Sequence, residues 1–397
     1  MSSPTSDTIE FACSACQKSL RVPRSAAGKK AKCPDCGSIQ HIPDAQSVVA
    51  ESSADGQAVD APEIGAFRST LDDRHAEQAT ETRTRQLFKK ITREVSKIYV
   101  GQDELVLGTL TALFSNGHVL IESAPGLGKT LFVRTLGRVL GCQFGRVQFT
   151  ADLMPSDITG APIFDMKTNE FRFRPGPIFT QLLLADEINR SPAKTHAALL
   201  EIMQEFRVTI DGTSHDIDRP FLVLATQNPI ESEGTYNLPE AQLDRFMFKL
   251  MLNYPAIDEE AEILRMHSRQ VDINRRLEDE LEVVTSPEEI LEIAKLNSDV
   301  IVDDKLIDYI NKIVRLTREW PQFHMGASPR AGITLMQGAR TLAAFSGRDY
   351  AVPDDVVQIA IPALRHRVIL SAEAEVEGHD VDDLLTELIR TVEVPRL

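Results

Sequence analysis

The stretch Ser123-Ala124-Pro125-Gly126-Leu127-Gly128-Lys129-Thr130 decides the fold of this 397-residue chain. It directly follows the apolar run 118–121, and an apolar run before a glycine turn predicts a buried strand that leads into a helix. The backbone N–H groups of such a turn, together with the helix N-terminus, can surround a phosphate. Lys129 would then reach the β- and γ-phosphates, and the Thr130 hydroxyl would hold Mg²⁺. The stretch therefore predicts a P-loop, the phosphate-binding turn of a nucleotide site.

The first position of this motif departs from the usual pattern. The pattern begins with Gly, and this chain has Ser123 there, a residue that avoids positive φ. The entry of the loop must therefore be non-left-handed or slightly strained. The end of the motif, 128–130, is intact. Taken alone, a glycine turn that only caps a helix is the alternative interpretation.

A second apolar run, 182–185, ends in two carboxylates, Asp186 and Glu187. Asp186 is placed to bind Mg²⁺ through water, and Glu187 is placed to polarise the attacking water of a phosphoryl transfer. The alternative for two acids at a strand end is helix N-capping, since Ser191-Pro192 follows soon after. The preceding P-loop favours the catalytic interpretation.

Composition limits where such a protein works. No apolar run approaches the roughly 20 residues of a membrane span, and the first ten residues are too polar for a signal peptide. A cytoplasmic protein is therefore expected. The formal net charge is −16, although residues 1–46 hold six Lys/Arg against four Asp/Glu. An acidic body argues mildly against a nucleic-acid motor, whose channel needs positive charge.

Four of the five cysteines follow the pattern CxxC, sixteen residues, CxxC, at Cys13, Cys16, Cys33 and Cys36. Two such pairs place four thiolates around Zn²⁺, with short strands expected at 19–22 and 39–42, so a zinc ribbon is predicted. The metal would supply the folding energy of so small a module. A pair of disulfides is the alternative, which a reducing cytosol disfavours. The basic surface of this module suits nucleic acid or an acidic partner, and a solvated face of an interaction module explains it equally well.

The remaining pattern predicts an α/β chain followed by helices. Strands alternating with helices imply a parallel sheet flanked by helices, with hairpins at 161–164/170–173 and at 207–210/217–221. A helix is expected over 191–206 with Ser191 as its N-cap, and another over 71–98. Beyond 255 the patterns are helical. We expect a zinc-ribbon domain at 1–43, a flexible linker at 44–70, an α/β ATPase core at 71–254 and an all-α lid domain at 255–397.

With these residues in hand, the chain resembles the AAA+ ATPases, and within them the MoxR family, from about residue 95 to the C-terminus. Five landmarks in order carry the resemblance: APGLGKT at 124–130, DEINR at 186–190, ATQNP at 225–229, LPEAQLDRF at 238–246 and SPRA at 328–331. The zinc ribbon is not part of the MoxR pattern, so the resemblance implies nothing about its target.

The resemblance assigns roles by position. Asn228 is similar to the sensor that positions the lytic water, and Arg245 to an arginine finger that enters a neighbouring subunit's site. Arg330 is similar to a second sensor carried on the lid. With Lys129 and Glu187, Asn228 and Arg245 form the implied catalytic set. The implied nucleotide-binding residues are Gly101, Gln102, Ser123, Ala124, Pro125, Gly126, Leu127, Gly128, Lys129, Thr130, Asp186 and Arg330, with Thr130 and Asp186 on Mg²⁺. A finger in trans requires a ring or filament, and the family implies hexamers.

The expected function is a MoxR-type machine that hydrolyses ATP to remodel a partner protein. The family implies a client that often carries a von Willebrand A-type metal-binding domain. One alternative is a nucleic-acid motor or DNA-bound regulator, which the basic ribbon and the cluster 172–174 favour, although packing within a hairpin explains that cluster equally well. The other is a nucleotide-dependent scaffold without turnover, which only Ser123 supports.

Overall fold

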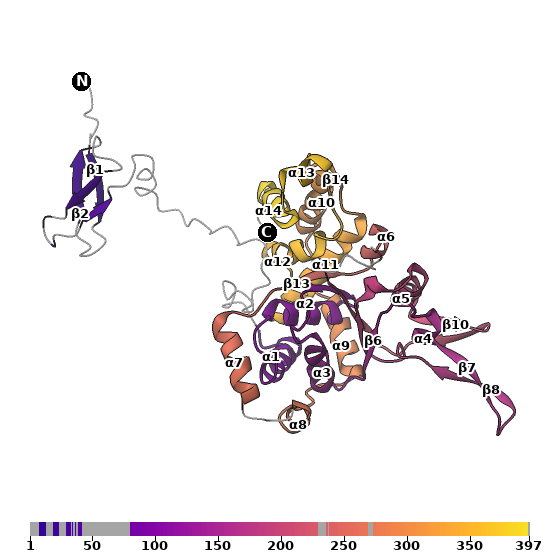
Figure 1. Cartoon of the computed structure of the whole chain (residues 1–397). Helices are drawn as coiled ribbons and strands as arrows, with labels where there is room; N and C mark the ends of the chain where they lie inside the picture. Colours follow the sequence, from indigo (N-terminus) through magenta and orange to yellow (C-terminus); the bar gives the residue numbers. More distant parts are fainter. Residues whose placement is uncertain are drawn as a thin grey trace. The chain divides into compact units, whose positions relative to one another are not determined.

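The computed structural model describes residues 8–12, 19–23, 29–32, 34, 36, 39–41, 80–228, 236, 238–268 and 273–395 (Figure 1). The chain separates into two units, 1–61 and 62–397, each with its own internal contacts. No helix in these described ranges is long and apolar enough to cross a membrane.

The first unit contains two antiparallel hairpins. Strand β1 (Thr8–Ala12) pairs with β2 (Ser19–Pro23), and β3 (Lys30–Lys32) pairs with β4 (Ile39–His41). The strands predicted at 19–22 and 39–42 are therefore present. Cys36 lies in the exposed turn between β3 and β4, whereas Cys13, Cys16 and Cys33 lie outside the described residues. The described residues hold no group of three or more metal-ligating side chains, so zinc binding stays a prediction.

A five-stranded parallel sheet forms the centre of the second unit, in the order β13-β5-β12-β9-β6. Alternate side chains of each strand point to opposite faces. In β9, Leu182 and Leu184 join one core cluster, whereas Leu183 and Ala185 join the other. Burial on both faces explains why the three central strands, β5, β12 and β9, read as nearly continuous apolar runs rather than alternating ones. The strands are β5 (Val119–Ser123), β6 (Phe144–Gln148), β9 (Leu182–Asp186), β12 (Leu222–Gln227) and β13 (Phe248–Leu252).

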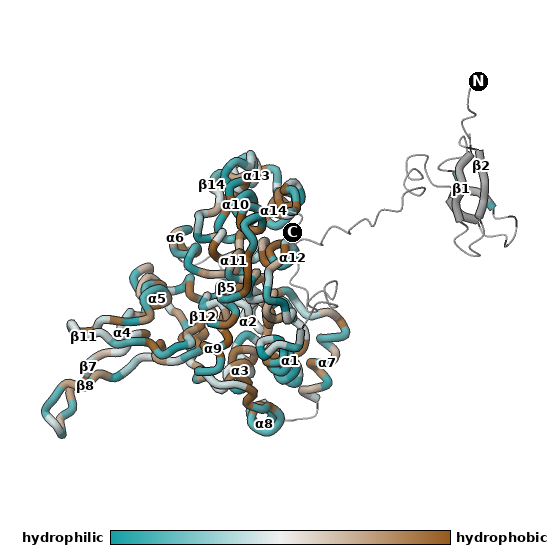
Figure 2. Tube along the Cα trace, turned by 180° about the vertical axis from the view of Figure 1, so that it is seen from behind, coloured by the Kyte–Doolittle hydropathy of each residue, from teal (hydrophilic) through white to brown (hydrophobic). Residues whose placement is uncertain are grey.

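Helices cover both faces of this sheet. The first cluster contains residues of α1 (Arg83–Ser96), α2 (Asp103–Phe114) and α3 (Lys129–Leu140), and the second contains residues of α5 (Ala193–Glu205). Figure 2 shows the hydrophobic residues concentrated where these helices meet the strands. The helix predicted over 71–98 is present in part, as α1, which begins at Arg83 with Thr82 as its N-cap; residues 80–82 are not helical, and residues 71–79 lie outside the described part.

The start of α5 differs from the prediction. The helix begins at Ala193, its N-cap position is Pro192, and no side chain caps it. Ser191 is fully buried and its Oγ donates to the carbonyl of Ile188 at 3.4 Å, so this hydroxyl satisfies the preceding turn (η3, Ile188–Arg190) instead.

Two hairpins extend from the sheet beside a short helix, α4 (Pro155–Thr159) (Figure 1). The hairpin of β7 (Gly160–Asp165) and β8 (Glu170–Pro175) confirms the first prediction. The second prediction is wrong in its return strand, since β10 (Arg207–Ile210) pairs with β11 (Thr213–Asp216) and not with 217–221. Asp211 and Gly212 both have positive φ, which closes a two-residue turn and starts the pairing at Thr213.

The part after residue 255 is helical, as predicted, apart from one short strand pair in its described residues. Its helices pack on the same core as the sheet: Phe345 stacks on Phe88 of α1 with ring centroids 4.3 Å apart. A small antiparallel pair joins β14 to β15. The elements are α6 (Glu240–Leu243), α7 (Ile257–Ser268), α8 (Ile273–Asp279), α9 (Pro287–Ser298), α10 (Asp304–Glu319), β14 (Phe323–Met325), α11 (Pro329–Phe345), α12 (Pro353–Leu364), β15 (Ile369–Leu370), α13 (Ala372–Glu377) and α14 (Val381–Thr391).

Candidate functional site

The glycine turn between β5 and α3 has the backbone that a phosphate cradle needs. Gly126 and Gly128 have φ of +86° and +76°, a region that glycine enters without steric cost. A Cβ built on Gly126 would meet nothing within 4 Å, so the space beside the turn is open. Helix α3 begins at Lys129, which aims its first N–H groups at that space.

Ser123 fits this turn without strain. It is the last residue of β5 and is not among the residues with positive φ, so the entry of the loop is extended and not left-handed. Its buried hydroxyl accepts a hydrogen bond from Lys129 Nζ at 2.6 Å. The serine therefore orients the lysine that the motif places at the phosphates.

Lys129 and the two carboxylates at the end of β9 lie at the same end of the sheet, because β5, β12 and β9 run parallel and in register. Burial lowers the pKa of Lys129 below its usual range, while the charges of Asp186 and Glu187 act in the opposite direction. The ammonium group also reaches the Ala124 carbonyl at 3.4 Å. The cation and the two acids thus meet at one edge of the sheet, and Thr130 follows in the first turn of α3.

Thr226 organises the two acids, a role that the sequence did not reveal. Its hydroxyl donates to Asp186 Oδ1 at 2.6 Å and accepts from the backbone N–H of Glu187 at 2.9 Å. Glu187 needs this anchor because its φ of 56° is a left-handed conformation that is unusual for glutamate. In the register of β12 and β9, Ala225 pairs with Ala185, so the next residue, Thr226, lies directly beside Asp186.

Strand β6 holds both acids from the other side. Arg146 Nη2 lies 2.8 Å from Asp186 Oδ2 and also donates to Gln148 Oε1 at 2.8 Å. Gln148 Nε2 donates in turn to Glu187 Oε2 at 2.7 Å. The same Oε2 lies 3.1 Å from Arg190 Nε. Sequence reasoning missed these contacts, because they depend on strand order rather than on a local motif.

Asn228 directly follows β12, at the same edge of the sheet as the P-loop. Gln227 pairs with Glu122, the residue before Ser123, and Gln227 Nε2 donates to Glu122 Oε2 at 2.6 Å. Lys249 of β13 lies 2.8 Å from that same carboxylate oxygen. This network ties the strand that carries Asn228 to the strand that carries the P-loop.

A pocket of about 380 Å³ adjoins the glycine turn on the side of α7. Gln102, Leu127 and Ile263 are among its lining residues, and Gln102 Nε2 donates to the Asn253 carbonyl at 2.7 Å. Gly101 has φ of +72°, and a Cβ there would come within 2.7 Å of the Glu259 carboxyl carbon. The predicted nucleotide-binding residues Gly101 and Gln102 therefore lie beside an apolar pocket.

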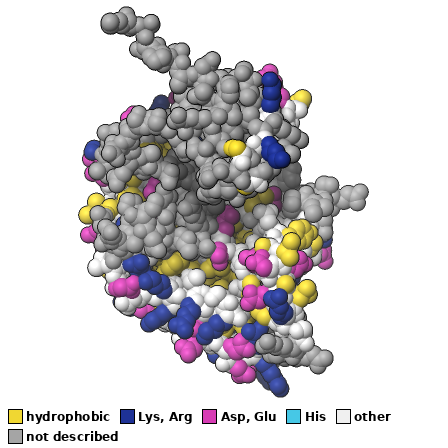
Figure 3. All heavy atoms as spheres, turned by 90° about the vertical axis from the view of Figure 1, so that its left-hand side faces the viewer, with side chains coloured by type: hydrophobic (Ala, Val, Ile, Leu, Met, Phe, Trp, Pro, Cys, Tyr) yellow, Lys and Arg dark blue, Asp and Glu magenta, His cyan; other side chains and the backbone are white. Residues whose placement is uncertain are grey.

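Tyr99 is a lining residue of this pocket that sequence reasoning missed. Its hydroxyl is buried without a hydrogen-bond partner in the described part of the chain, and burial raises its pKa. Figure 3 shows the side of the molecule on which α7 lies, where hydrophobic and charged side chains are interspersed. On α7 and the segment before it, Tyr254, Ile257 and Leu264 are exposed.

Arg245 and Arg330 do not join this site. In the parallel pair of β13 and β5, Phe248 lies beside Val119 and Leu252 lies beside Ser123. Arg245 precedes Phe248, so it lies beyond the end of the sheet opposite the P-loop. The strand between those two ends, from Phe248 to Leu252, is roughly 13 Å long at about 3.3 Å per residue. Arg330 Nη1 lies 3.9 Å from Asp244 Oδ2, which places Arg330 with the Arg245 segment.

Known proteins are similar to this chain in sequence and in fold. The family model described as "ATPase family associated with various cellular activities (AAA)" matches residues 118–248, and the model described as "AAA lid domain" matches residues 315–388. The uncharacterised protein YeaC of Bacillus subtilis is 44% identical over 309 residues, which are 78% of this chain and 95% of YeaC.

Two further relatives extend the comparison. Chaperone MoxR1 of Mycobacterium tuberculosis is 42% identical over 314 residues, 77% of this chain and 81% of that protein. A crystal structure of a Cytophaga hutchinsonii protein assigned as an ATPase superposes with a TM-score of 0.74 at 40% identity, covering 79% of this chain and 96% of that one.

Proposed function

The chain belongs to the MoxR family of AAA+ ATPases and is an ATP hydrolase, and from this premise we propose how it works. We propose that Lys129, Asp186 and Glu187 carry out the hydrolysis and that the cycle of ATP binding and hydrolysis remodels a partner protein. The observation that supports these roles is the parallel register of β5, β12 and β9, which brings the open glycine turn with Lys129 and the two carboxylates to the same end of the sheet. Phosphoryl transfer needs positioning and positive charge rather than covalent chemistry from the protein.

The residues present fit Mg²⁺. The Thr130 hydroxyl and the Asp186 carboxylate are the oxygen donors that Mg²⁺ prefers, and Asp186 Oδ2 already faces a cation, the Arg146 guanidinium, at 2.8 Å. Bound there, the ion supplies positive charge to the phosphate oxygens. Lys129 adds its own charge, and the N–H groups of the glycine turn bind the phosphates.

Glu187 acts on the attacking water in this proposal. Its carboxylate accepts from Gln148 and Arg190 in the present structure, so it must exchange these partners for the water when the substrate binds. The carboxylate then orients the water and takes up its proton, while the Asn228 amide holds the water in line.

Arg245 completes the site of a neighbouring copy. The opposite edge of the sheet is too far from this chain's own P-loop, so the register supports a role in trans. The guanidinium makes no hydrogen bond or ion pair with the residues that the structure describes. We propose a closed ring, a hexamer, in which Arg245 stabilises the charge on the transferred phosphoryl group and Arg330 senses nucleotide from the same side.

The client is proposed to be a protein. On the β7–β8 hairpin, Met166 and Phe171 are 88% and 72% exposed, apolar surface that suits contact with a polypeptide. A relative named as a chaperone supports the same class, and a client with a von Willebrand A-type domain stays part of the proposal. The basic and aromatic cluster at 172–174 favours nucleic acid less, because Phe173 already stacks on His215 at 4.1 Å.

The zinc ribbon belongs to the proposal as well. Four cysteines at paired spacing and the two short hairpins support a structural zinc site in residues 1–43. The scaffold alternative loses its argument, since Ser123 is extended and bonds to Lys129.

Phosphate release tests the hydrolytic roles. Glu187→Gln should lose at least about 100-fold in turnover and keep its affinity for ATP, since the amide cannot take up a proton. Glu201→Gln, an exposed change on α5, is the matched control and should match wild type. Equal, near-zero rates in wild type and Glu187→Gln would remove the proposed role of Glu187.

A further inference from the structure

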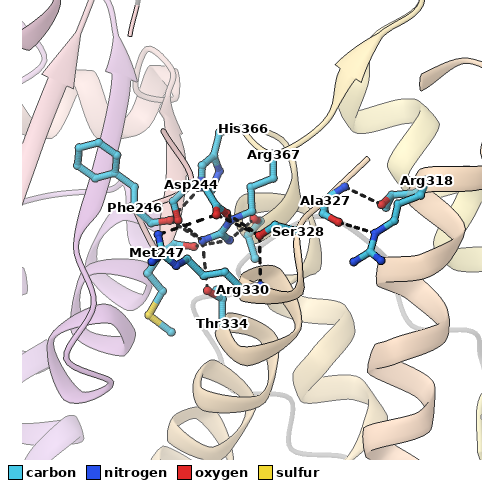
Figure 4. A network of polar contacts seen from close by, with 12 residues as sticks. Asp244, Phe246, Met247, Arg318, Ala327, Ser328, Arg330, Thr334, His366 and Arg367 are labelled. Carbon is cyan, nitrogen blue, oxygen red and sulfur yellow. Dashed lines mark hydrogen bonds and ion pairs between the residues drawn. The ribbon is translucent and has the colours of Figure 1, made fainter. Parts of the chain in front are cut away.

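The short loop that carries Arg245 is anchored by the C-terminal helices (Figure 4). Asp244 accepts from Arg367 Nε at 2.8 Å and from Ser328 Oγ at 3.0 Å. Ser328 is the N-cap of α11, and Arg330 at 3.9 Å adds a second cation to the same carboxylate. Three side chains from the region after α10 therefore converge on the residue immediately before Arg245.

Arg367 also binds the backbone on the other side of Arg245. Its Nη2 donates to the Phe246 carbonyl at 2.7 Å and to the Asp244 carbonyl at 3.2 Å. His366 Nε2 donates to the same Phe246 carbonyl at 3.0 Å. Both neighbours of Arg245 are thus held, and the Phe246 side chain is fully buried.

On its N-terminal side the loop has little else to define its position. Helix α6 ends at Leu243 after four residues, and the backbone N–H groups of Arg245 and Phe246 make only short-range bonds, to the Gln242 and Leu243 carbonyls. The first long-range backbone bond of the loop comes two residues after Arg245, from Met247 N to the His118 carbonyl at 2.8 Å. Such a turn does not set the direction of a side chain relative to the sheet. The bonds from Arg367 span 123 residues of sequence and supply that reference.

Burying a guanidinium is costly unless its donors are satisfied, so Arg367 tolerates only a narrow geometry. Its side chain is 2% exposed, and it also donates to the Ala363 carbonyl at 2.6 Å and to Thr334 Oγ1 at 3.2 Å. Burial lowers its pKa to about 10, and the group stays cationic at neutral pH. The planar fork reaches several acceptors at once, which a lysine ammonium cannot do.

We propose that Arg367 is a positioning residue for Arg245: it fixes the loop 244–247 so that the Arg245 guanidinium is aimed at the neighbouring copy's ATP. This inference rests on the proposed function of Arg245 in trans. Ser328 and Arg330 of the α11 N-terminus contact the Asp244 carboxylate as well. A shift of α11 relative to the sheet would therefore also move the loop that carries Arg245.

The direct test compares Arg367→Lys with Arg365→Lys. Arg365 is the matched control, since it lies two residues away, is 8% exposed and pairs with Asp382 instead of the loop. Arg367→Lys should lower the kcat for ATP by up to about 100-fold, the scale of a misplacement of about 1 Å, and leave the Kd for ATP within about threefold. Arg365→Lys should leave kcat near wild type. Loss of ATP binding by Arg367→Lys would instead indicate a general structural role and overturn the inference.

Mixed assemblies separate positioning from damage to the ATP site. Glu187→Gln subunits cannot hydrolyse ATP but carry an intact Arg245. Mixed with Arg367→Lys subunits, they should restore turnover, because the variant's own ATP site then receives a correctly placed finger. Should Arg367→Lys not fold, Asp244→Asn replaces it and should show the same rescue.

The pair Arg245→Ala with Glu187→Gln is measured first. If this pair fails to restore turnover, the finger in trans and the inference both fall. If it restores turnover and neither Arg367→Lys nor Asp244→Asn does, only the positioning role of Arg367 is overturned.

Discussion

His118, the residue before β5, makes the stability of the ATP-binding sheet depend on pH. Its ring is buried: Nδ1 accepts from the Val223 N–H at 3.1 Å, and Nε2 lies 3.0 Å from the Met203 carbonyl. Nε2 must carry a proton to donate to the Met203 carbonyl, and Nδ1 must be unprotonated to accept from the Val223 N–H, so the ring is a neutral imidazole. A second proton, on Nδ1, would point at the N–H of Val223. Burial accordingly lowers the pKa of His118 from 6.5 to about 4.

The direction and size of the effect follow from this pKa. Between pH 6.5 and pH 4 the unfolded chain binds the proton and the folded chain does not, so protonation favours unfolding. The free energy of unfolding therefore falls as the pH drops below 6.5 and levels off below about 4. At about 1.4 kcal/mol per pKa unit, the full loss is about 3 kcal/mol, of which about 2 kcal/mol is expected between pH 7 and pH 4.5.

Urea denaturation at pH 7 and pH 4.5, for wild type and His118→Asn, isolates this contribution. Asparagine keeps an acceptor for the Val223 N–H and does not titrate, so its loss of stability between the two pH values should be about 2 kcal/mol smaller. His366, whose pKa burial also lowers, acts in both proteins and cancels in the comparison. A difference below about 0.5 kcal/mol, the scale of an ordinary surface change, would refute the buried neutral histidine.

Three further predictions concern the candidate site and the N-terminal module. Thr226→Val should lower the free energy of unfolding by about 1–3 kcal/mol and reduce turnover, because it leaves the N–H of Glu187 without an acceptor; unchanged urea curves would contradict this. Arg146→Gln should raise the apparent affinity for Mg²⁺ by about 2–5-fold, the scale of a half-exposed ion pair, because Asp186 loses its counter-ion in the protein. A titration of ATPase activity with Mg²⁺ measures this change, and weaker Mg²⁺ binding would contradict it. The purified chain should hold about one zinc per copy by atomic emission and lose it in Cys13→Ser, with equal zinc in both proteins counting against the ribbon.

Much of the candidate site could be predicted from local sequence motifs. The P-loop, Asp186-Glu187 and Asn228 each lie where an apolar strand ends, and carboxyl ends of parallel strands meet at one edge of a sheet. Helix patterns likewise identified the C-terminal helices. The errors are also local: the return strand of the second hairpin was placed four residues too late, because the tightness of the turn at 211–212 depends on backbone angles.

The contacts that complete the site come from the tertiary structure. Thr226, Arg146 and Gln148 reach the acids only because β12 and β6 flank β9, an order that no stretch of sequence states. Arg367 and Asp244 lie 123 residues apart and meet through the packing of the C-terminal helices on β13.

By itself, then, the sequence determined the phosphate-binding turn, the two acids and the alternation of strands and helices, because each depends on residue type and spacing over a few positions. Only the tertiary structure decided that Ser123 is extended, that Arg245 and Arg330 lie on the far edge of the sheet, and which side chains hold the acids. Those features follow from strand order and register, which arise when distant segments bury their apolar faces together.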